Sequence, residues 1–187
     1  RAFLGIGAGG SLTLDPLGIE RRSPLAAVTE TIDACRHLFS TDPVTRSGHH
    51  VTLRQASIPW ARPTTEIWFA GRGPRMLALG ASTCDGVMLD FIHPSVLPAV
   101  VDTVRTTAAA ASRPGRISYS TTVITDEDDL EFLRPHMTYR LVDTQPEVRD
   151  RLGMTDADVE RIRTAMAGGL LAAAEHVRDE WILPYVI

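Results

Sequence analysis

Short apolar segments alternate with helical segments along this chain, and this alternation restricts the possible folds more than any other feature of the sequence. The apolar runs are rich in Ile, Val, Leu and aromatic residues and end in glycine or a polar turn, as buried strands do. They predict strands at 2–7, 66–70, 86–91 and 116–124. Strands that alternate with helices form parallel βα units, so the sequence predicts an α/β fold.

Helix signals occupy the segments between these strands. They predict helices at 24–39, at 74–83, from Pro94 to Ala108, and from Thr155 through Val177, where Thr155-x-x-Asp158 fits a capping box. Between 42 and 63 the β-branched residues predict a small hairpin at the edge. The acidic run 126–129 predicts a solvated loop after the fourth strand, with a cation site as the alternative.

Composition excludes several classes of function. The chain has 187 residues, and its 19 basic residues, all Arg, are outnumbered by 23 acidic ones, so nucleic-acid binding is not expected. The longest apolar run, 166–174, is far shorter than the roughly 20 residues that a membrane span needs. Cys35 and Cys84 are isolated and the six His are scattered, so we expect no disulfide, no metal site and a cytoplasmic protein. Cys35 falls on an apolar helix face and is interpreted as a core residue.

A glycine-rich segment follows the first predicted strand. Gly5–Gly10 matches the GxGxxG pattern of dinucleotide-binding sites. Such a site needs a helix directly after the glycines, because the helix amides hold the pyrophosphate, whereas the first good helix start here is Ser23. A glycine-rich strand end that lines a cofactor cavity is the alternative.

A second glycine-rich segment, Gly71–Arg75, follows the second predicted strand. Its two glycines allow a ligand to approach the backbone, and Pro74 fits the first position of a helix whose free amides attract anions. The Arg75 guanidinium can add charged hydrogen bonds. An ordinary βα turn with surface arginines is the alternative.

Four segments together carry a resemblance to a known family, and they cover about half of the chain. They are 1–9, 24–39, the run EIWFAGRGPRML at 66–77 and DGV at 85–87. In this order and spacing they resemble the bacterial luciferase-like monooxygenase superfamily, and within it the F420-dependent oxidoreductases that are similar to methylenetetrahydromethanopterin reductases. Residues 136–140 and 184–187 resemble the same branch more loosely.

The resemblance implies a TIM (β/α)8 barrel of which this chain contains only strands four to seven. Residues 1–187 would then form one partial luciferase-like domain. Because a whole barrel takes about 250 residues, the chain looks like an internal piece of a longer protein or a degenerate relative. Four strands leave two sheet edges open, so we expect either a homodimer that covers them or a longer parent chain.

The resemblance also implies where a cofactor binds. The expected phosphate contacts are Gly71, Arg72, Gly73, Pro74 and Arg75, and the residues expected beside the ribityl chain or phosphate are Gly7, Ala8 and Gly9. Luciferases have an Arg where Ala8 stands, and a chain without Lys or Asn indicates the GC-rich coding of F420-producing actinobacteria. Both observations favour F420 over FMN. No catalytic residue is assigned, because most residues near the reacting carbon belong to the strands that the match leaves out.

These inferences predict an enzyme, an oxidoreductase that uses reduced F420 for hydride transfer to or from a small organic substrate. An FMN-dependent monooxygenase is the first alternative. A non-catalytic flavin-binding or structural remnant of the barrel is the second.

Overall fold

The computed structural model describes residues 2–10, 14, 17–40 and 42–187. It contains two compact units that we treat separately. Unit 1 consists of the chain up to Asp90 together with Ala99–Ser120, and unit 2 consists of Phe91–Pro98 together with Thr121–Ile187. This division does not test the prediction of one family domain over 1–187, which stays a prediction.

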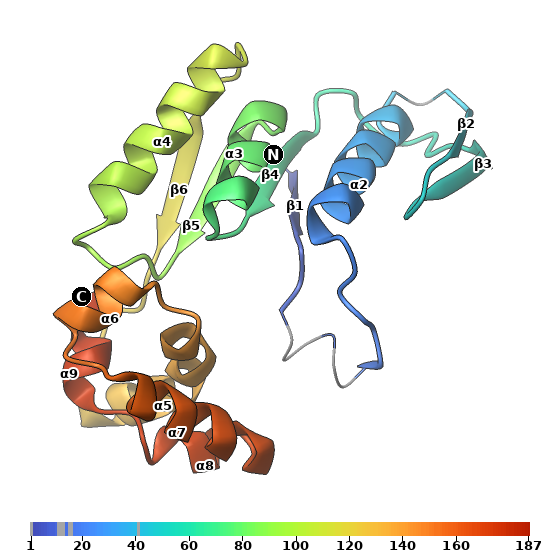
Figure 1. Cartoon of the computed structure of the whole chain (residues 1–187). Coiled ribbons are helices and arrows are strands. Elements are labelled where there is room, and N and C mark those ends of the chain that lie inside the picture. The colour runs from blue at the N-terminus through green and yellow to red at the C-terminus, as the bar shows by residue number, and fades with distance from the viewer. Residues whose placement is uncertain (1, 11–13, 15–16, 41) are drawn as a thin grey trace. The chain divides into compact units, whose positions relative to one another are not determined.

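Unit 1 is built on a parallel sheet of four strands (Figure 1). These are β1 (Phe3–Gly7), β4 (Glu66–Ala70), β5 (Gly86–Asp90) and β6 (Arg116–Ser120). Their spatial order is β1-β4-β5-β6 and every adjacent pair is parallel, as the sequence predicts. The order follows the chain without reversal. A Rossmann sheet reverses its order at the binding crevice, so this topology is that of a singly wound sheet such as a TIM barrel.

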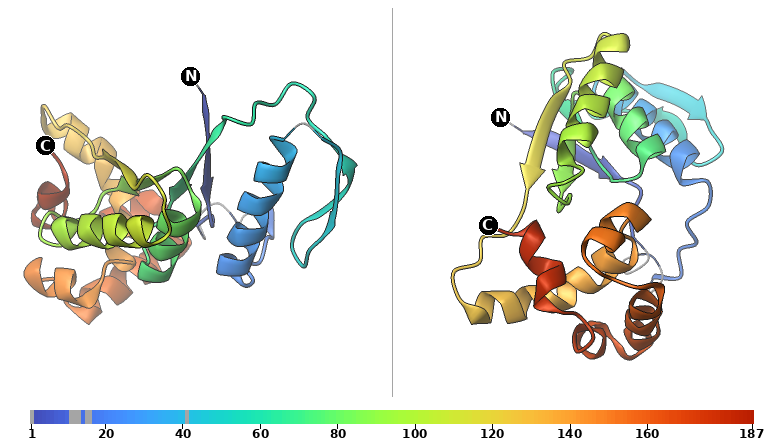
Figure 2. Two further views of the ribbon diagram at one scale, coloured as in Figure 1. Left: turned by 90° about the horizontal axis from the view of Figure 1, so that it is seen from above. Right: turned by 60° about the vertical axis from the view of Figure 1, so that its left-hand side comes forward.

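The helices of unit 1 are α2 (Pro24–Leu38), α3 (Pro74–Thr83) and α4 (Leu97–Ala110). They cover one face of the sheet, and the alternate burial of side chains along β4 shows which face it is. Ile67 and Phe69 are fully buried and pack with Val28 and Ile32 of α2. Because side chains alternate across a strand, Trp68 points to the opposite face. The two further views in Figure 2 show the helices beside the sheet.

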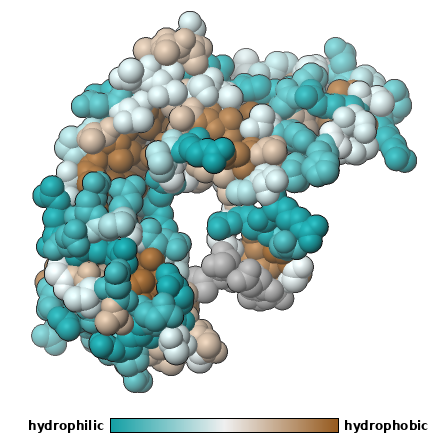
Figure 3. Space-filling model, viewed as in Figure 1, coloured by the Kyte–Doolittle hydropathy of each residue, from teal (hydrophilic) through white to brown (hydrophobic). Residues whose placement is uncertain are grey.

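The predicted hairpin is present as β2 (Val44–Ser47) and β3 (Thr52–Ala56), which are antiparallel. Its turn is attached to α2 by one carboxylate. Glu30 accepts hydrogen bonds from the amides of His50 at 2.7 Å and Val51 at 3.0 Å, and these bonds hold the pKa of Glu30 below its usual value. In the view of Figure 3, apolar residues of unit 1 gather over the region of α3 and α4 rather than over the hairpin.

Two predicted boundaries of these elements need correction, and one predicted helix start is confirmed. The fourth strand ends at Ser120 rather than 124, because the next residues leave the sheet and the amide of Ile124 donates to the carbonyl of Ile187 at 2.8 Å. The helix predicted from Pro94 begins at Leu97, because His93 and Ser95 first form a turn closed by a 2.7 Å side-chain bond. The helix start predicted at Ser23 is confirmed, since Ser23 is the N-cap of α2 and Pro24 its first residue, although Ser23 has a left-handed conformation and its side chain makes no capping bond in the described structure.

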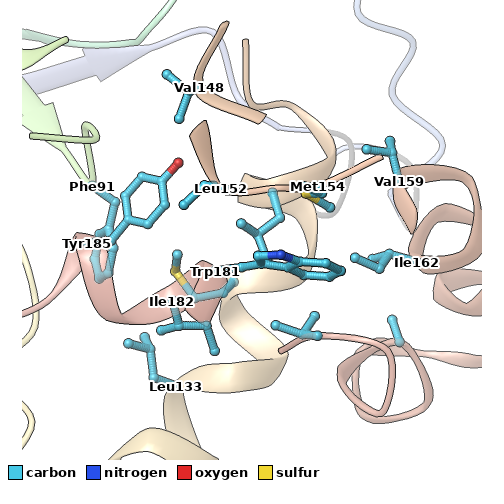
Figure 4. Close-up of a cluster of buried hydrophobic side chains, with 14 residues drawn as sticks. Phe91, Leu133, Val148, Leu152, Met154, Val159, Ile162, Trp181, Ile182 and Tyr185 are labelled. Carbon is cyan, nitrogen blue, oxygen red and sulfur yellow. The ribbon is translucent and has the colours of Figure 1, made fainter. Parts of the chain in front are cut away.

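Unit 2 is helical and has its own core. Its elements are α5 (Glu127–Val142), α6 (Pro146–Arg151), α7 (Asp156–Ala165), η2 (Met166–Gly168), α8 (Leu170–Ala174), α9 (Asp179–Ile182) and η3 (Leu183–Tyr185). Figure 4 shows Trp181, which is fully buried, among Met154, Ile162 and Ile182 at the centre of this core.

Two predictions for unit 2 were wrong and one is confirmed. The acidic run 126–129 is not a loop but the start of α5, where Asp126 accepts a bond from the amide of Asp129. Carboxylates are favourable there because a helix N-terminus is partly positive. The last long helix is interrupted at Gly169, whose φ of 102° is outside helical geometry. The capping box of Thr155 and Asp158 is present.

Among the described residues, none of the helices combines the length and the apolar character needed to cross a membrane.

Candidate functional site

The turn between β4 and α3 has the backbone geometry of an anion site. Gly73 is the N-cap of α3 in an extended conformation, and Pro74 is the first helical residue. The first intrahelical bond runs from the amide of Leu77 to the carbonyl of Gly73 at 2.9 Å. The amides of Arg75 and Met76 lie before that bond and have no acceptor among the described residues. Two donors and the positive end of the α3 dipole therefore point out of the turn.

The glycines of this turn have different roles. A Cβ at Gly71 would lie 2.7 Å from the Phe69 ring, so packing alone excludes a side chain there. A Cβ at Gly73 would meet no atom within 4 Å, so nothing within the protein requires glycine at this position. Arg75 is exposed beside it, and Arg72 is half-buried. The open space at Gly73 is what a ligand that approaches the backbone requires.

The second predicted segment lies beside the first. Gly7 is the register partner of Ala70, so Gly7–Gly9 and Gly71–Gly73 leave adjacent parallel strands at the same edge of the sheet. Strands in a sheet are about 4.8 Å apart. Gly7 is exposed, whereas Ala8 packs against the core below α2. Of these two residues, Gly7 has the freer access to a ligand.

A third cation, which the sequence patterns do not predict, lies at this edge. Arg21 is exposed and its guanidinium Nη1 donates to the carbonyl of Gly9 at 3.1 Å. Gly9 has a φ of 71°, a conformation that favours glycine. The sequence signal was an arginine pair, Arg21 and Arg22, in the loop before α2, but only the structure shows which of the two contacts the strand end.

The chemistry of this edge is that of phosphate recognition. Free amides, a helix N-terminus and guanidinium groups bind anions through charge-assisted hydrogen bonds. The cysteines lie elsewhere, and burial raises the pKa of both the Cys35 and the Cys84 thiol, which disfavours the nucleophilic thiolate. In the part of the chain that the structure describes, no three His, Cys, Asp or Glu side chains gather as they would around a metal ion.

Comparison with known proteins identifies the family. The family described as luciferase-like monooxygenase matches residues 1–182 of this chain. The chain belongs to the luciferase-like monooxygenase family. The resemblance that the sequence indicates is thereby confirmed.

Several curated proteins are similar to this luciferase-like chain. A 5,10-methylenetetrahydromethanopterin reductase of Methanolobus tindarius is 32% identical over 116 residues, which are 62% of this chain and 35% of the relative. The enzyme of the same name from Archaeoglobus fulgidus is 25% identical and covers 97% of this chain and 58% of the relative. A phthiodiolone/phenolphthiodiolone dimycocerosates ketoreductase of Mycobacterium kansasii is 33% identical over 70% of this chain and 38% of the relative.

Solved structures agree on the fold. The coenzyme F420-dependent tetrahydromethanopterin reductase of Methanopyrus kandleri matches with a TM-score of 0.76 at 20% identity, over 97% of this chain and 59% of that one. An F420-dependent secondary alcohol dehydrogenase, solved with an F420-acetone adduct, matches with a TM-score of 0.62 at 19% identity, over 93% and 61%. The predicted fold class, part of a TIM barrel, is confirmed. The chain spans from about a third to three fifths of the length of these relatives.

Proposed function

We propose that this luciferase-like chain binds coenzyme F420 and takes part in hydride transfer between reduced F420 and a small organic substrate. The observation that carries the proposal is the turn at Gly71–Arg75, which offers two unbonded amides, open space at Gly73 and an exposed guanidinium. The names of the relatives support this choice of cofactor, since both solved structures are described as F420-dependent.

The residues at the carboxyl edge of the sheet fit the phosphate of F420. The amides of Arg75 and Met76 would hold phosphate oxygens, and the Arg75 side chain would add a charged bond. Gly7 lies at the end of β1, and Arg21 donates to the carbonyl of Gly9 just after it, so both residues would flank the ribityl chain. When bound in its reduced form, F420 supplies the hydride, and the protein supplies binding, orientation and electrostatics.

The residue at position 8 supports F420 rather than FMN. The resemblance places an Arg at this position in luciferases, and here the position holds Ala8. Ala8 is half-buried and packs against the apolar cluster below α2, so position 8 offers no guanidinium to a phosphate. The proposal further includes a cytoplasmic location and a small-molecule substrate without nucleic-acid partners.

The test is a pair of binding titrations on the purified chain. Oxidised F420 and FMN are titrated separately with the protein, and the polarisation of each cofactor's own fluorescence reports binding. We expect saturable binding of F420 and at least about tenfold weaker binding of FMN, a difference of about 1.4 kcal/mol. Tighter binding of FMN would favour the monooxygenase alternative. Binding of neither cofactor would leave the non-catalytic remnant as the better description.

A further inference from the structure

The hairpin and the segment that follows it form a basic arm on unit 1. Residues 43–65, which we call the hairpin arm, contain Arg46, Arg54 and Arg62 and no acidic residue, although acidic residues outnumber arginines in the whole chain. Arg46 is neutralised by an ion pair with Asp33 of α2. Arg54 and Arg62 are exposed and form no ion pair or hydrogen bond with the residues that the structure describes. The arm therefore presents positive charge that nothing described in the chain neutralises.

An exposed aromatic side chain lies beside this charge. Trp60 is 83% exposed, more than any other large hydrophobic residue that the structure describes. The backbone around it is closed by two turns, in which the amide of Ala61 bonds the carbonyl of Ile58 at 2.9 Å and the amide of Thr65 bonds that of Arg62 at 2.8 Å. Tryptophan and arginine are the residues most enriched in the energetic centres of protein interfaces. Their pairing here has the composition of a docking surface.

The hairpin part of the arm is fixed to α2, so the arm does not have to be ordered by a partner. Glu30 holds the turn through backbone amides, including that of His49 at 3.2 Å, and the pair of Asp33 with Arg46 holds the first strand. A surface that is already ordered loses less conformational entropy when a partner binds. This rigidity favours a specific contact.

A surface of the opposite charge lies at the start of α5. Unit 2 contains twice as many acidic residues as arginines. Of the acidic residues that begin α5, Glu127 and Asp128 are exposed and have no ion pair or hydrogen bond with the described residues. Phe132, one helical turn after Asp128, is 76% exposed, and its ring lies 5.5 Å from that of the exposed His136. This patch, like the arm, combines unpaired charge with an exposed aromatic ring.

We propose that the hairpin arm of one copy of this chain docks on the start of α5 in a second copy. Trp60 would lie against Phe132, and Arg62 would pair with Glu127 or Asp128. The occupant is a second copy because each patch has the charge that the other lacks, and complementary charge selects partners and orients them. Two copies related by a twofold axis make this contact twice, which closes the assembly as a dimer. The inference does not depend on the proposed function.

The mass of the purified chain, measured by light scattering after size exclusion at several concentrations and salt strengths, tests the contact. We expect a dimer whose dissociation constant rises about tenfold between about 0.05 M and about 0.5 M NaCl, because salt screens exposed charges. Trp60→Ser and Phe132→Ser should each weaken the dimer about tenfold or more. Leu171→Ser is the control, because Leu171 is 77% exposed on α8 but belongs to neither patch, and it should leave the dimer unchanged.

Charge reversal tests which two patches meet. Arg62→Glu and Asp128→Arg each place like charges opposite one another, so each should weaken the dimer at least about tenfold. The chain that carries both substitutions should regain the dimer, because the two signs are exchanged. Arg105→Glu, at an exposed position of α4, is the control and should dimerise like the parent. Circular dichroism spectra that match the parent exclude unfolding as the cause of any loss.

The outcomes decide the proposal. A parent chain that is monomeric up to about 0.1 mM would overturn it, since the contact would then be too weak to form a dimer. A dimer that Trp60→Ser and Phe132→Ser leave intact would show that the copies meet elsewhere, for example through the open edges of the sheet. Loss of the dimer in both charge variants without recovery in the double variant would show that these two patches do not pair.

Discussion

At the scale of single residues, Asp85 anchors unit 1 through bonds to three groups, and it lies at the edge of the sheet opposite the candidate site. Its carboxylate accepts bonds from the amide of Ile67 at 2.9 Å and from Arg113 at 2.8 Å, and a longer one from Arg36 at 3.4 Å. One side chain thus joins β4, α2 and the segment before β6. In barrel folds, residues at the amino-terminal edge of the sheet contribute to stability, whereas catalytic residues lie at the carboxyl edge.

Removal of this carboxylate should destabilise the protein. Asp85→Ala leaves the strand amide of Ile67 without its acceptor and removes the carboxylate that pairs with two guanidinium groups, so we expect a loss of about 2–4 kcal/mol in the free energy of unfolding. Glu20→Ala is the matched control, because the Glu20–Arg22 pair is exposed, and it should cost less than about 0.5 kcal/mol. Urea unfolding followed by circular dichroism measures both. Equal midpoints for the two variants would contradict the role of Asp85.

Local sequence patterns identify the residues of the phosphate turn but not the side chains that meet across the sheet. Gly71–Arg75 is a local motif, and a strand end, two glycines and a helix-starting proline can be recognised without a structure. Trp68 and Arg116 are 48 positions apart in the sequence, and only the register of β4, β5 and β6 aligns them. Pairing of that kind depends on strand neighbours, which the local pattern does not specify.

At the scale of elements, the four parallel strands were predictable and the helical unit was only partly so. The strands are short apolar runs that end in glycine or a polar turn, and in β4 the residues that face the helices, Ile67 and Phe69, are fully buried. Helix α5 was missed because Pro135 lies inside it and acidic residues begin it, although Leu133, Met137 and Leu141 are spaced as a buried helical stripe. Packing of that stripe in the core of unit 2 outweighs the proline.

The capping box of α7 should make stability depend on pH. Hydrogen bonds from the side chain and the amide of Thr155 hold the pKa of Asp158 below its usual value, with Arg178 and Arg161 contributing. A depressed folded-state pKa gives stability that is present above the unfolded pKa and is lost as pH falls through the folded one. Asp158→Asn should therefore be less stable than the parent at pH 6, by about 1 kcal/mol as for other caps, and the difference should shrink below about pH 3.

Chemical unfolding at several pH values checks this prediction. Thr155→Ala serves as a second variant, because it removes the hydroxyl partner and retains the carboxylate. A difference between parent and Asp158→Asn that stays constant from pH 6 to acid conditions would show that the charge of Asp158 contributes nothing to the cap.

At the scale of the whole molecule, the described strands form an open sheet. β1 and β6 each pair with one neighbour only, and Phe3 on β1 is 57% exposed. Open parallel edges associate readily, because their unpaired amides and carbonyls can extend the sheet. We therefore expect either a longer parent chain whose strands pair with these edges or a homodimer that covers them, and the homodimer would have twice the mass of the single chain in light scattering after size exclusion. A monodisperse monomer across micromolar concentrations would contradict this expectation.

The central claim, that the turn between β4 and α3 holds the cofactor phosphate, is tested most directly by titrating F420 into two variants of this turn. Arg75→Ala removes a charge-assisted hydrogen bond worth about 1.5–3 kcal/mol, so we predict tenfold to a hundredfold weaker binding, measured by cofactor fluorescence. Gly73→Val should weaken binding at least as much, because its side chain would fill space that is open in the protein itself. Arg54→Ala, on exposed β3, is the control and should bind like the parent. Dissociation constants for Arg75→Ala and Gly73→Val that equal those of the parent and the control would contradict the account.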